Sequence, residues 1–231
     1  MRNVVITGCG RGIGLEFVRQ LLHRGDRVYA GARRPENSPE LMGLARANAD
    51  RLTVLPLDVT REAHRANLVA TLGQQPVDLL INNAGVYGPV PDRLGTTDET
   101  AWLETFRINT IAPRQMVESL LPQLGRSSRP CIALLSSKMG SMGDNGSGGA
   151  YIYRSSKAAL NAVGVSMAHD LADQGILTLI LHPGWVLTDM GGPNAEITVE
   201  RSVAAMLHTL DTAGPTDNGR FIDIDGSTIP W

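Results

Sequence analysis

Short apolar, β-branched runs alternate with longer amphipathic segments along the whole chain of 231 residues. Several of the short runs are continuously apolar, a pattern typical of strands buried on both faces of a parallel sheet. Repeated strand–helix units form right-handed crossovers, which place helices on both faces of the sheet. The sequence therefore predicts a single α/β domain, residues 1–231, with a doubly wound parallel sheet of about seven strands. The predicted strands are Asn3–Thr7, Arg27–Ala32, Leu52–Leu57, Val77–Asn82, Cys131–Ser136, Ile176–His182 and Phe221–Asp225.

The amphipathic segments between these runs predict five helices. Gly25 is a natural C-terminal cap for the first, and Thr60 is expected to cap the start of the second. Pro113 lies inside the third segment and lacks an N–H group, which predicts a kink or break near Asn109. The predicted helices are Ile13–Arg24, Thr60 to about Leu72, Thr100–Leu124, Tyr151–Gln174 and Thr198–Leu210.

The composition excludes several classes of protein. A formal net charge of −2 provides no broad electrostatic field for nucleic acid or for an anionic membrane. No stretch approaches the ~20 apolar residues of a membrane span, and the first apolar run is too short for a signal peptide. Two separated cysteines, Cys9 and Cys131, indicate a reduced, cytoplasmic protein, and the five histidines have no metal-ligand spacing.

Glycine is unusually common, at 25 residues, and four of these glycines lie between the first predicted strand and helix. The segment Thr7–Gly14 has the pattern T-G-x-x-x-G-x-G. It does not fit G-x-G-x-x-G in any register, and it lacks the Gly-Lys-Ser/Thr of a P-loop. Glycines let the backbone approach a pyrophosphate closely, and the helix that follows offers N–H groups and the positive end of its dipole. We therefore predict a Rossmann-type dinucleotide site. Its phosphate turn consists of Gly8, Gly10, Arg11, Gly12, Ile13 and Gly14.

The end of the second predicted strand bears on the choice of cofactor. Proteins that prefer NAD usually place an acidic residue about 20 residues after the glycines, where it bonds to the ribose 2′-hydroxyl. This chain has Arg33 and Arg34 in that region, and Arg11 in the glycine turn. Guanidinium groups suit a 2′-phosphate through charge-assisted, bidentate hydrogen bonds. We expect NADP(H) to be preferred, with NAD(H) as the alternative if Arg33 and Arg34 form only a solvated turn.

Tyr153 and Lys157 are four residues apart on a predicted helix and therefore share one face. A phenol with a pKa of about 10 exchanges protons poorly at neutral pH, and a nearby ammonium lowers that pKa. The pair can therefore act as a general acid and base. Tyr151 lies six residues before Lys157, on a different face, and does not offer this arrangement.

The fifth predicted strand ends in hydroxyl groups at the carboxyl edge of the sheet. Ser137 is the preferred candidate for a catalytic hydroxyl, with Ser136 and Ser141 as alternatives. The glycine-rich segment Gly140–Gly149 then leads to Tyr153, and we expect it to form a flexible wall of the site. Ser137 lies 16 residues before Tyr153, and this segment accounts for the length of the interval.

The order of these features resembles that of the short-chain dehydrogenase/reductases over essentially the whole chain. Within the family, the chain resembles the carbonyl reductases related to Sniffer and the C-factor signalling proteins. The interval between Ser137 and Tyr153 is longer than the family's commonest one, as in the Sniffer-like group. The matching positions are Thr7–Gly14, Asp58-Val59, Asn82–Gly85, Asn109, Ser136–Ser141, Gly148–Asn161, His182–Met190 and Asp225–Trp231.

The resemblance implies a role for each matching residue. Tyr153 would give a proton to a substrate carbonyl, Ser137 would polarise that carbonyl, and Lys157 would lower the pKa of Tyr153 and bond the nicotinamide ribose. Asn109 would hold a water that relays protons through Lys157. Trp185 and Met190 would either fill the core or form a wall for the substrate. The other cofactor contacts would be Asp58 and Val59 at the adenine, Asn83, Ala84 and Gly85 beside Asn82 at the adenosine ribose, and Pro183, Gly184, Val186 and Thr188 at the nicotinamide.

These observations lead to one expected function and two alternatives. We expect an NADPH-dependent oxidoreductase that reduces an aldehyde or ketone to an alcohol, with Tyr153 as general acid. The first alternative is a C-factor-like signalling or regulatory protein that binds NAD(P) with little turnover. The second is an NAD-dependent alcohol dehydrogenase that uses the same residues. The resemblance also implies a homodimer or a tetramer, with a small carbonyl or alcohol compound as the substrate.

Overall fold

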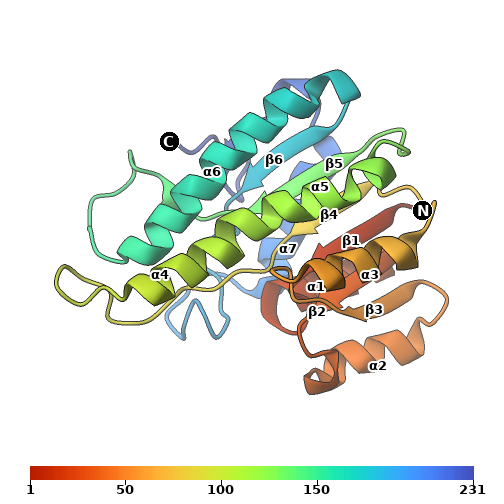
Figure 1. Cartoon of the computed structure of the whole chain (residues 1–231), viewed down its shortest axis with the longest axis horizontal. Coiled ribbons are helices and arrows are strands. Elements are labelled where there is room, and N and C mark those ends of the chain that lie inside the picture. The colour runs from red at the N-terminus through yellow and green to blue at the C-terminus, as the bar shows by residue number, and fades with distance from the viewer.

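The computed structural model describes residues 1–231 and contains one seven-stranded, fully parallel sheet (Figure 1). Its strand order is β3-β2-β1-β4-β5-β6-β7, so the direction in which strands are added reverses between β1 and β4. The predicted fold class is therefore confirmed. The strands are β1 (Asn3–Thr7), β2 (Arg27–Ala32), β3 (Leu52–Pro56), β4 (Leu79–Asn82), β5 (Cys131–Leu135), β6 (Leu177–Leu181) and β7 (Phe221–Ile222).

Helices cover both faces of this sheet, and each face has its own core. Val4 and Ile6 of β1 point into a core of 26 buried residues under α1, α2 and α7. Val5 points into the opposite core of 23 buried residues under α3, α5 and α6, which is why β1 is apolar throughout. Figure 1 shows α5 and α6 side by side in front of the sheet and α7 behind it. None of the helices has the length and apolar character needed to cross a membrane. The helices are α1 (Gly12–His23), α2 (Pro39–Ala47), α3 (Glu62–Leu72), α4 (Glu99–Phe106), α5 (Ala112–Leu124), α6 (Tyr151–Leu171) and α7 (Val199–Thr212).

All seven predicted strands are present, but several are shorter than expected. The largest difference is in β7, which ends at Ile222 and not at Asp225. The N–H of Asp223 donates to the carbonyl of Ser227, and the N–H of Gly226 donates to the carbonyl of Asp223. A turn closed by these two hydrogen bonds therefore replaces the last residues of the predicted strand.

Two helix expectations need correction. Thr60 does not cap α3, because that helix begins at Glu62 and the Thr60 hydroxyl donates to the Asp58 carboxylate. α2 was not among the predicted helices, and Leu41 is its one fully buried residue. A local signal for α2 does exist: Ser38 caps its start, and Pro39 occupies its first position.

The expected helix break near Asn109 is confirmed as a π-helical segment. Residues Arg107–Ile111 form this segment between α4 and α5, and Pro113 lies in the first turn of α5. Pro113 has no N–H to donate back into the preceding turn, and the π-helical hydrogen bond from Ala112 to Arg107 lies directly before it. The segment places Asn109, which is fully buried, between the loop after β4 and α6.

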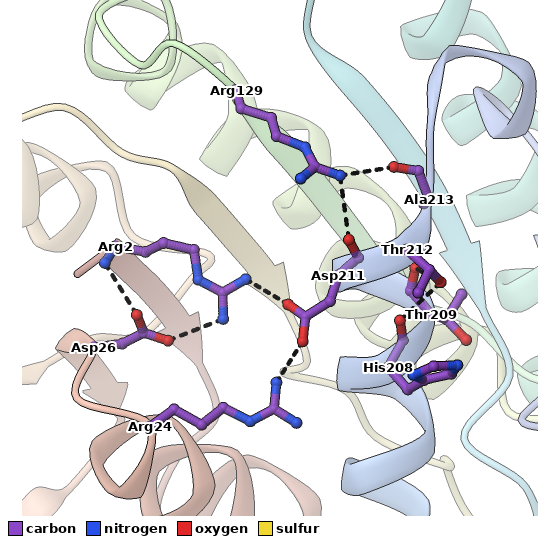
Figure 2. A network of polar contacts seen from close by, with 9 residues as sticks. All are labelled: Arg2, Arg24, Asp26, Arg129, His208, Thr209, Asp211, Thr212 and Ala213. Atoms are coloured by element: carbon purple, nitrogen blue, oxygen red, sulfur yellow. Dashed lines mark hydrogen bonds and ion pairs between the residues drawn. The ribbon is translucent and has the colours of Figure 1, made fainter.

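The amino edge of the sheet is closed by a network of ion pairs (Figure 2). Arg2 binds Asp26 and Asp211, and Arg24 binds the second carboxylate oxygen of Asp211. Arg129 donates to backbone carbonyls at the end of α7. A cavity of about 730 Å³ lies at this edge. The Asp211 carboxylate in its wall is already paired with Arg2 and Arg24. These contacts attach α7 to the start of β1, and they lie at the opposite edge from the predicted site.

Candidate active site

The phosphate turn joins β1 to α1 at the carboxyl edge of the sheet, beside the point where the strand order reverses. Gly8 has a φ of +73°, and a Cβ there would lie 2.9 Å from the Cα of Ala84. A Cβ on Gly14 would lie 2.3 Å from the carbonyl oxygen of Gly8. No side chain caps α1, and its first turn contains no acidic residue. The N–H groups at its start and the positive end of its dipole are therefore available to a phosphate.

Thr7 and Asn83 hold this turn against the end of β4. The hydroxyl oxygen of Thr7 accepts hydrogen bonds from the N–H groups of Asn83 and Ala84. Nδ2 of Asn83 donates to the carbonyl oxygens of Thr7 and Gly8, at 2.8 and 3.1 Å. The side chain of Asn83 therefore packs the turn, and these contacts account for its position without a ligand. Asn82 is buried beside it, and its Nδ2 has no partner.

Gly85 lies nearer to the predicted catalytic residues than to the phosphate turn. A Cβ on Gly85 would lie 3.3 Å from Oδ1 of Asn109 and 3.6 Å from Nζ of Lys157. The expected place of Gly85 on the adenosine side of the cofactor stays a prediction, and its neighbours in this structure are the predicted catalytic residues Asn109 and Lys157. The small residue leaves space for the Asn109 and Lys157 side chains at this point.

The ends of β2 and β3 form the other side of the turn. Arg33 and Arg34 are exposed directly after β2, and Asp58 follows β3. Burial would raise the pKa of Asp58, but hydrogen bonds from Thr60 and the charges of Arg33 and His64 lower it below its ordinary value. Val59 is buried, and its carbonyl oxygen accepts a hydrogen bond from a guanidinium of α3. Two exposed guanidinium groups and an ionised carboxylate therefore surround the end of β2.

Arg11 does not join Arg33 and Arg34 in this structure. Its guanidinium pairs with Asp189 in the loop after β6, and both side chains are largely exposed. A Cβ on Gly12 would lie 3.3 Å from Cγ2 of Thr188 in the same loop. The phosphate turn is thus in contact with residues almost 180 positions later in the chain.

The loop after β6 contains the four residues expected at the nicotinamide. The carbonyl of Pro183 accepts a hydrogen bond from Ser202, and Gly184 has a φ of +80°. Val186 is buried and pairs with Ile197, whereas Thr188 accepts a hydrogen bond from the N–H of Gly191. In the same loop, Trp185 and Met190 are about half exposed, so neither side chain fills the core.

α6 carries Tyr153 and Lys157 on one buried face. Nζ of Lys157 lies 5.7 Å from the centroid of the Tyr153 ring and donates to the carbonyl of Leu135 at 2.8 Å. Tyr153 is 8% exposed and Lys157 is 5% exposed. The structure therefore brings the two residues together at the carboxyl end of β5, as their spacing predicts.

Burial controls the protonation of this pair. Burial raises the pKa of Tyr153 to about 12, although a hydrogen bond with Ser137 acts in the opposite direction. Burial also lowers the pKa of Lys157 to about 8. Burial is the largest cause of the rise in the pKa of Tyr153, and the expected effect of Lys157 on that pKa stays a prediction. At neutral pH the phenol of Tyr153 is protonated.

The three candidate serines have different partners. The Ser137 side chain interacts with Tyr153 in the sense that lowers the pKa of the phenol, and its oxygen accepts from the N–H of Met139. Ser136 donates to Oδ1 of Asn161, inside the protein. Ser141 accepts a hydrogen bond from the N–H of Asp144 in the following loop. Of the three serines, Ser137 is the one that affects the pKa of Tyr153.

Asn109 connects three parts of the site. Its Oδ1 accepts from the N–H of Val86 at 2.9 Å, and its Nδ2 donates to the carbonyl of Val86 at 2.8 Å. Nδ2 also donates to the hydroxyl of Ser156 on α6. The π-helical segment, the loop after β4 and α6 are therefore joined at one side chain.

Two residues of the site were not found from the sequence. The ring of Tyr87 stacks on the ring of Tyr153, with centroids 4.6 Å apart. Nδ1 of His182 accepts a hydrogen bond from the N–H of Lys138, directly after Ser137. Neither contact has a local sequence signal, because each joins residues 44 or more positions apart.

The buried imidazole of His182 leads us to expect that the folded protein loses stability in acid. Burial lowers its pKa from 6.5 to about 4, although the Asp223 carboxylate raises it in part. A depressed folded-state pKa stabilises the fold above pH 6.5, and this contribution is lost as the pH falls through 4. Allowing for its partial exposure, we expect about 2 kcal/mol of the free energy of unfolding to depend on His182 over this range.

The measurement is urea unfolding between pH 7 and pH 4. Asparagine retains a hydrogen-bond acceptor for the N–H of Lys138 but does not titrate, so His182→Asn should flatten the pH dependence. His208→Asn, at an exposed position of α7, should retain the wild-type slope. An unchanged slope in His182→Asn would show that another group causes the loss.

A family model described as short chain dehydrogenase matches residues 2–197. The chain belongs to this family. As a short-chain dehydrogenase, it is an oxidoreductase, and the resemblance inferred from the sequence motifs is confirmed. One relative is C-signal of Myxococcus xanthus, which is 46% identical over 156 residues, covering 68% of this chain and 93% of that protein.

Two solved carbonyl reductases have the same fold over the whole chain. Carbonyl reductase Sniffer of D. melanogaster has a TM-score of 0.93 and 34% identity, and 100% of each chain is covered. The NADPH-bound carbonyl reductase from chicken fatty liver has a TM-score of 0.94 and 34% identity, covering 100% of this chain and 99% of that one.

The short-chain dehydrogenase fold implies a nicotinamide dinucleotide, and the residues present fit one. The glycine turn has no room for side chains at Gly8 and Gly14, and α1 begins without a cap. A pyrophosphate could therefore approach the N–H groups at the start of α1. Exposed cationic groups at Arg33 and Arg34 lie where the adenosine ribose is held in such folds.

Proposed function

We propose that the protein is an NADP(H)-dependent carbonyl reductase of the short-chain dehydrogenase family. The observation that carries this proposal is geometric: Tyr153, Lys157 and Ser137 are buried together at the same edge of the sheet as the phosphate turn, with Nζ of Lys157 5.7 Å from the Tyr153 ring. When bound, the nicotinamide supplies the hydride that reduces the carbonyl carbon. The residues of the chain then have to bind the carbonyl, orient it and provide a proton.

Each of the four residues has a distinct part in this proposal. Ser137 donates a hydrogen bond to the carbonyl oxygen, which polarises it, and Tyr153 gives its phenolic proton to the same oxygen. Lys157 has two N–H donors besides the one on Leu135, and these would bond the nicotinamide ribose. The contacts of Asn109 in this structure anchor the loop after β4. Its expected part in a proton relay is supported by the family resemblance alone.

A protonated Tyr153 can act as the general acid that carbonyl reduction requires. A general acid must carry its proton before the reaction, whereas a general base must have lost it. With a pKa raised to about 12, the phenol carries its proton at pH 7. We favour a reductase over an NAD-dependent alcohol dehydrogenase because Arg33 and Arg34 suit a 2′-phosphate and because solved carbonyl reductases have the same fold.

Exposed apolar side chains around the site favour an apolar carbonyl compound. They come from the loops after β4, β5 and β6, where a protein surface would ordinarily be polar. These residues are Val90, Leu94, Met142, Trp185, Leu187 and Met190, and they are between 42% and 83% exposed. We propose that they bind the body of the substrate while its carbonyl lies between Ser137 and Tyr153.

Arg33 and Arg34 are the basis for proposing NADP(H), and Arg33→Ala tests it. Hydrogen bonds to charged groups are worth about 1.5–3 kcal/mol, so we expect the Kd of NADPH to rise about 10- to 100-fold. The Kd of NADH should stay within about twofold, because NADH has no 2′-phosphate. Both constants can be measured by nucleotide fluorescence. Arg46→Ala, at the exposed end of α2, is the matched control and should change neither. A wild-type protein that binds NADH more tightly than NADPH would contradict the proposal.

The similarity to C-signal favours a second candidate, a regulatory protein that binds NADP(H) without turnover. The two candidates differ in one measurement, which is NADPH oxidation with a panel of aldehydes and ketones. Turnover that depends on Tyr153 supports the reductase. Tight NADPH binding with no oxidation across an apolar and a polar panel supports the regulatory protein.

A further inference from the structure

Residues 86–92, which we call the anchoring loop, follow β4 and pack against the start of α6. Tyr87 stacks on the ring of Tyr153, with the two ring planes 25° apart. Val86 exchanges two hydrogen bonds with the side chain of Asn109. The anchoring loop therefore contacts two of the four residues in the proposed chemistry.

Asp92, at the end of the anchoring loop, caps α6 from outside that helix. α6 has no side-chain cap of its own, because Ala150 occupies the capping position with a φ of 48°. Oδ2 of Asp92 accepts from the N–H of Ile152 at 2.6 Å, and the Asp92 carbonyl accepts from the N–H of Ala150 at 3.0 Å. One residue, 60 positions before Ile152, thus satisfies two N–H groups at the start of α6.

The cap has a cost in stability that calls for an explanation. Asp92 is 8% exposed, and its second carboxylate oxygen, Oδ1, is buried without a hydrogen-bond partner. An unpartnered buried oxygen destabilises a fold, and such groups are uncommon in folded proteins. The carboxylate also lies at the positive end of the α6 dipole, where a negative charge is favourable. The N–H that the cap binds belongs to Ile152, which is one residue before Tyr153.

We propose that Asp92 is a positioning residue for proton transfer from Tyr153. By bonding the N–H of Ile152, it holds the backbone one residue before Tyr153, and Tyr87 holds the phenol ring from the same loop. The inference rests on the proposed function, because it takes Tyr153 as the proton donor. A displacement of about 1 Å in a reacting group costs roughly 100-fold in rate, so the first turn of α6 has to be held accurately.

The test compares Asp92→Ala with Asp92→Asn in the full-length protein. Removing the acceptor in Asp92→Ala should lower kcat for carbonyl reduction about 10- to 100-fold, with the Kd of NADPH within about twofold of wild type. Asparagine keeps an oxygen that accepts from Ile152, so Asp92→Asn should restore kcat to within about fivefold of wild type. Hydrogen–deuterium exchange at residues 150–157 should be faster in Asp92→Ala and close to wild type in Asp92→Asn.

Asp98→Ala is the matched control, because Asp98 caps α4 by accepting from the N–H of Ala101 in the segment after the anchoring loop. It removes a cap of the same chemistry, and kcat and exchange at residues 150–157 should stay near wild type. The proposal is overturned if Asp92→Ala keeps wild-type kcat and exchange, or if Asp92→Asn is as impaired as Asp92→Ala. A wild-type protein without carbonyl turnover would contradict the proposed function, and the exchange comparison would still decide whether Asp92 holds α6.

Discussion

Tyr153→Phe should lower kcat for carbonyl reduction by about 10²- to 10⁴-fold, the usual contribution of a positioned general acid. Phenylalanine keeps the ring that stacks on Tyr87 at 4.6 Å, so the packing of α6 is preserved. The change removes the phenolic hydroxyl, which is the proposed proton donor. The measurement is NADPH oxidation at saturating nucleotide with an apolar aldehyde, together with the Kd of NADPH. That Kd should stay within about threefold of wild type, because the phenol is not part of the phosphate turn.

Tyr151→Phe is the matched control for this prediction. Tyr151 is the first residue of α6, two positions before Tyr153, and is only partly buried. It lies on a different face of the helix from Lys157. Its replacement should change kcat less than about twofold. Equal turnover by wild type and Tyr153→Phe would remove Tyr153 from the mechanism and with it the main support for a reductase.

Gly14→Ala should impair both folding and nucleotide binding. The added Cβ would lie 2.3 Å from the carbonyl oxygen of Gly8 and 2.5 Å from Nδ2 of Asn83. The clash with backbone has no flexible side chain to relieve it, so we expect a loss of about 3 kcal/mol in the free energy of unfolding. Displacement of the phosphate turn should also remove hydrogen bonds to the pyrophosphate and raise the Kd of NADPH roughly 100-fold. Urea unfolding and nucleotide fluorescence measure the two effects.

Two other glycines separate the steric effect on the fold from the effect on the nucleotide. A Cβ on Gly10 would meet only Cβ of Ala32, at 3.9 Å, so Gly10→Ala should fold normally and still weaken NADPH if the pyrophosphate packs against this residue. Gly43 lies within α2, and Gly43→Ala should stabilise the protein by about 0.5–1 kcal/mol without changing nucleotide binding. Wild-type stability and NADPH affinity in Gly14→Ala would contradict the assigned role of the turn.

The fold was largely predictable, because its signals are local. Buried parallel strands are apolar on both faces, as the opposite directions of Val4 and Val5 show, so they stand out in the sequence. The ends of elements were less predictable, because a few tertiary hydrogen bonds decide them. Thr60 had the chemistry of a helix cap, but its hydroxyl bonds to Asp58 instead. β7 is short because Asp223 turns back to Ser227.

The catalytic candidates divide in the same way. The spacing of Tyr153 and Lys157 alone places them on one helix face, and the structure confirms that they are neighbours. The sequence left three serines open, and only the contact of Ser137 with Tyr153 distinguishes them. The caps and stacks around the tyrosine were also out of reach, because Tyr87 and Asp92 come from a loop about 60 residues earlier.

By itself, the sequence determined the architecture of this short-chain dehydrogenase, the place of its phosphate turn and the pairing of Tyr153 with Lys157. Each of these follows from hydrophobic periodicity, from glycines between a strand and a helix, or from the pitch of a helix. Only the tertiary structure decided which serine meets the tyrosine, where the guanidinium of Arg11 lies and which loop holds α6. It also decided the direction in which the pKa of Tyr153 shifts, because burial by distant segments raises the pKa of a phenol. Contacts and hydration depend on residues far apart in the chain, and a local pattern does not contain them.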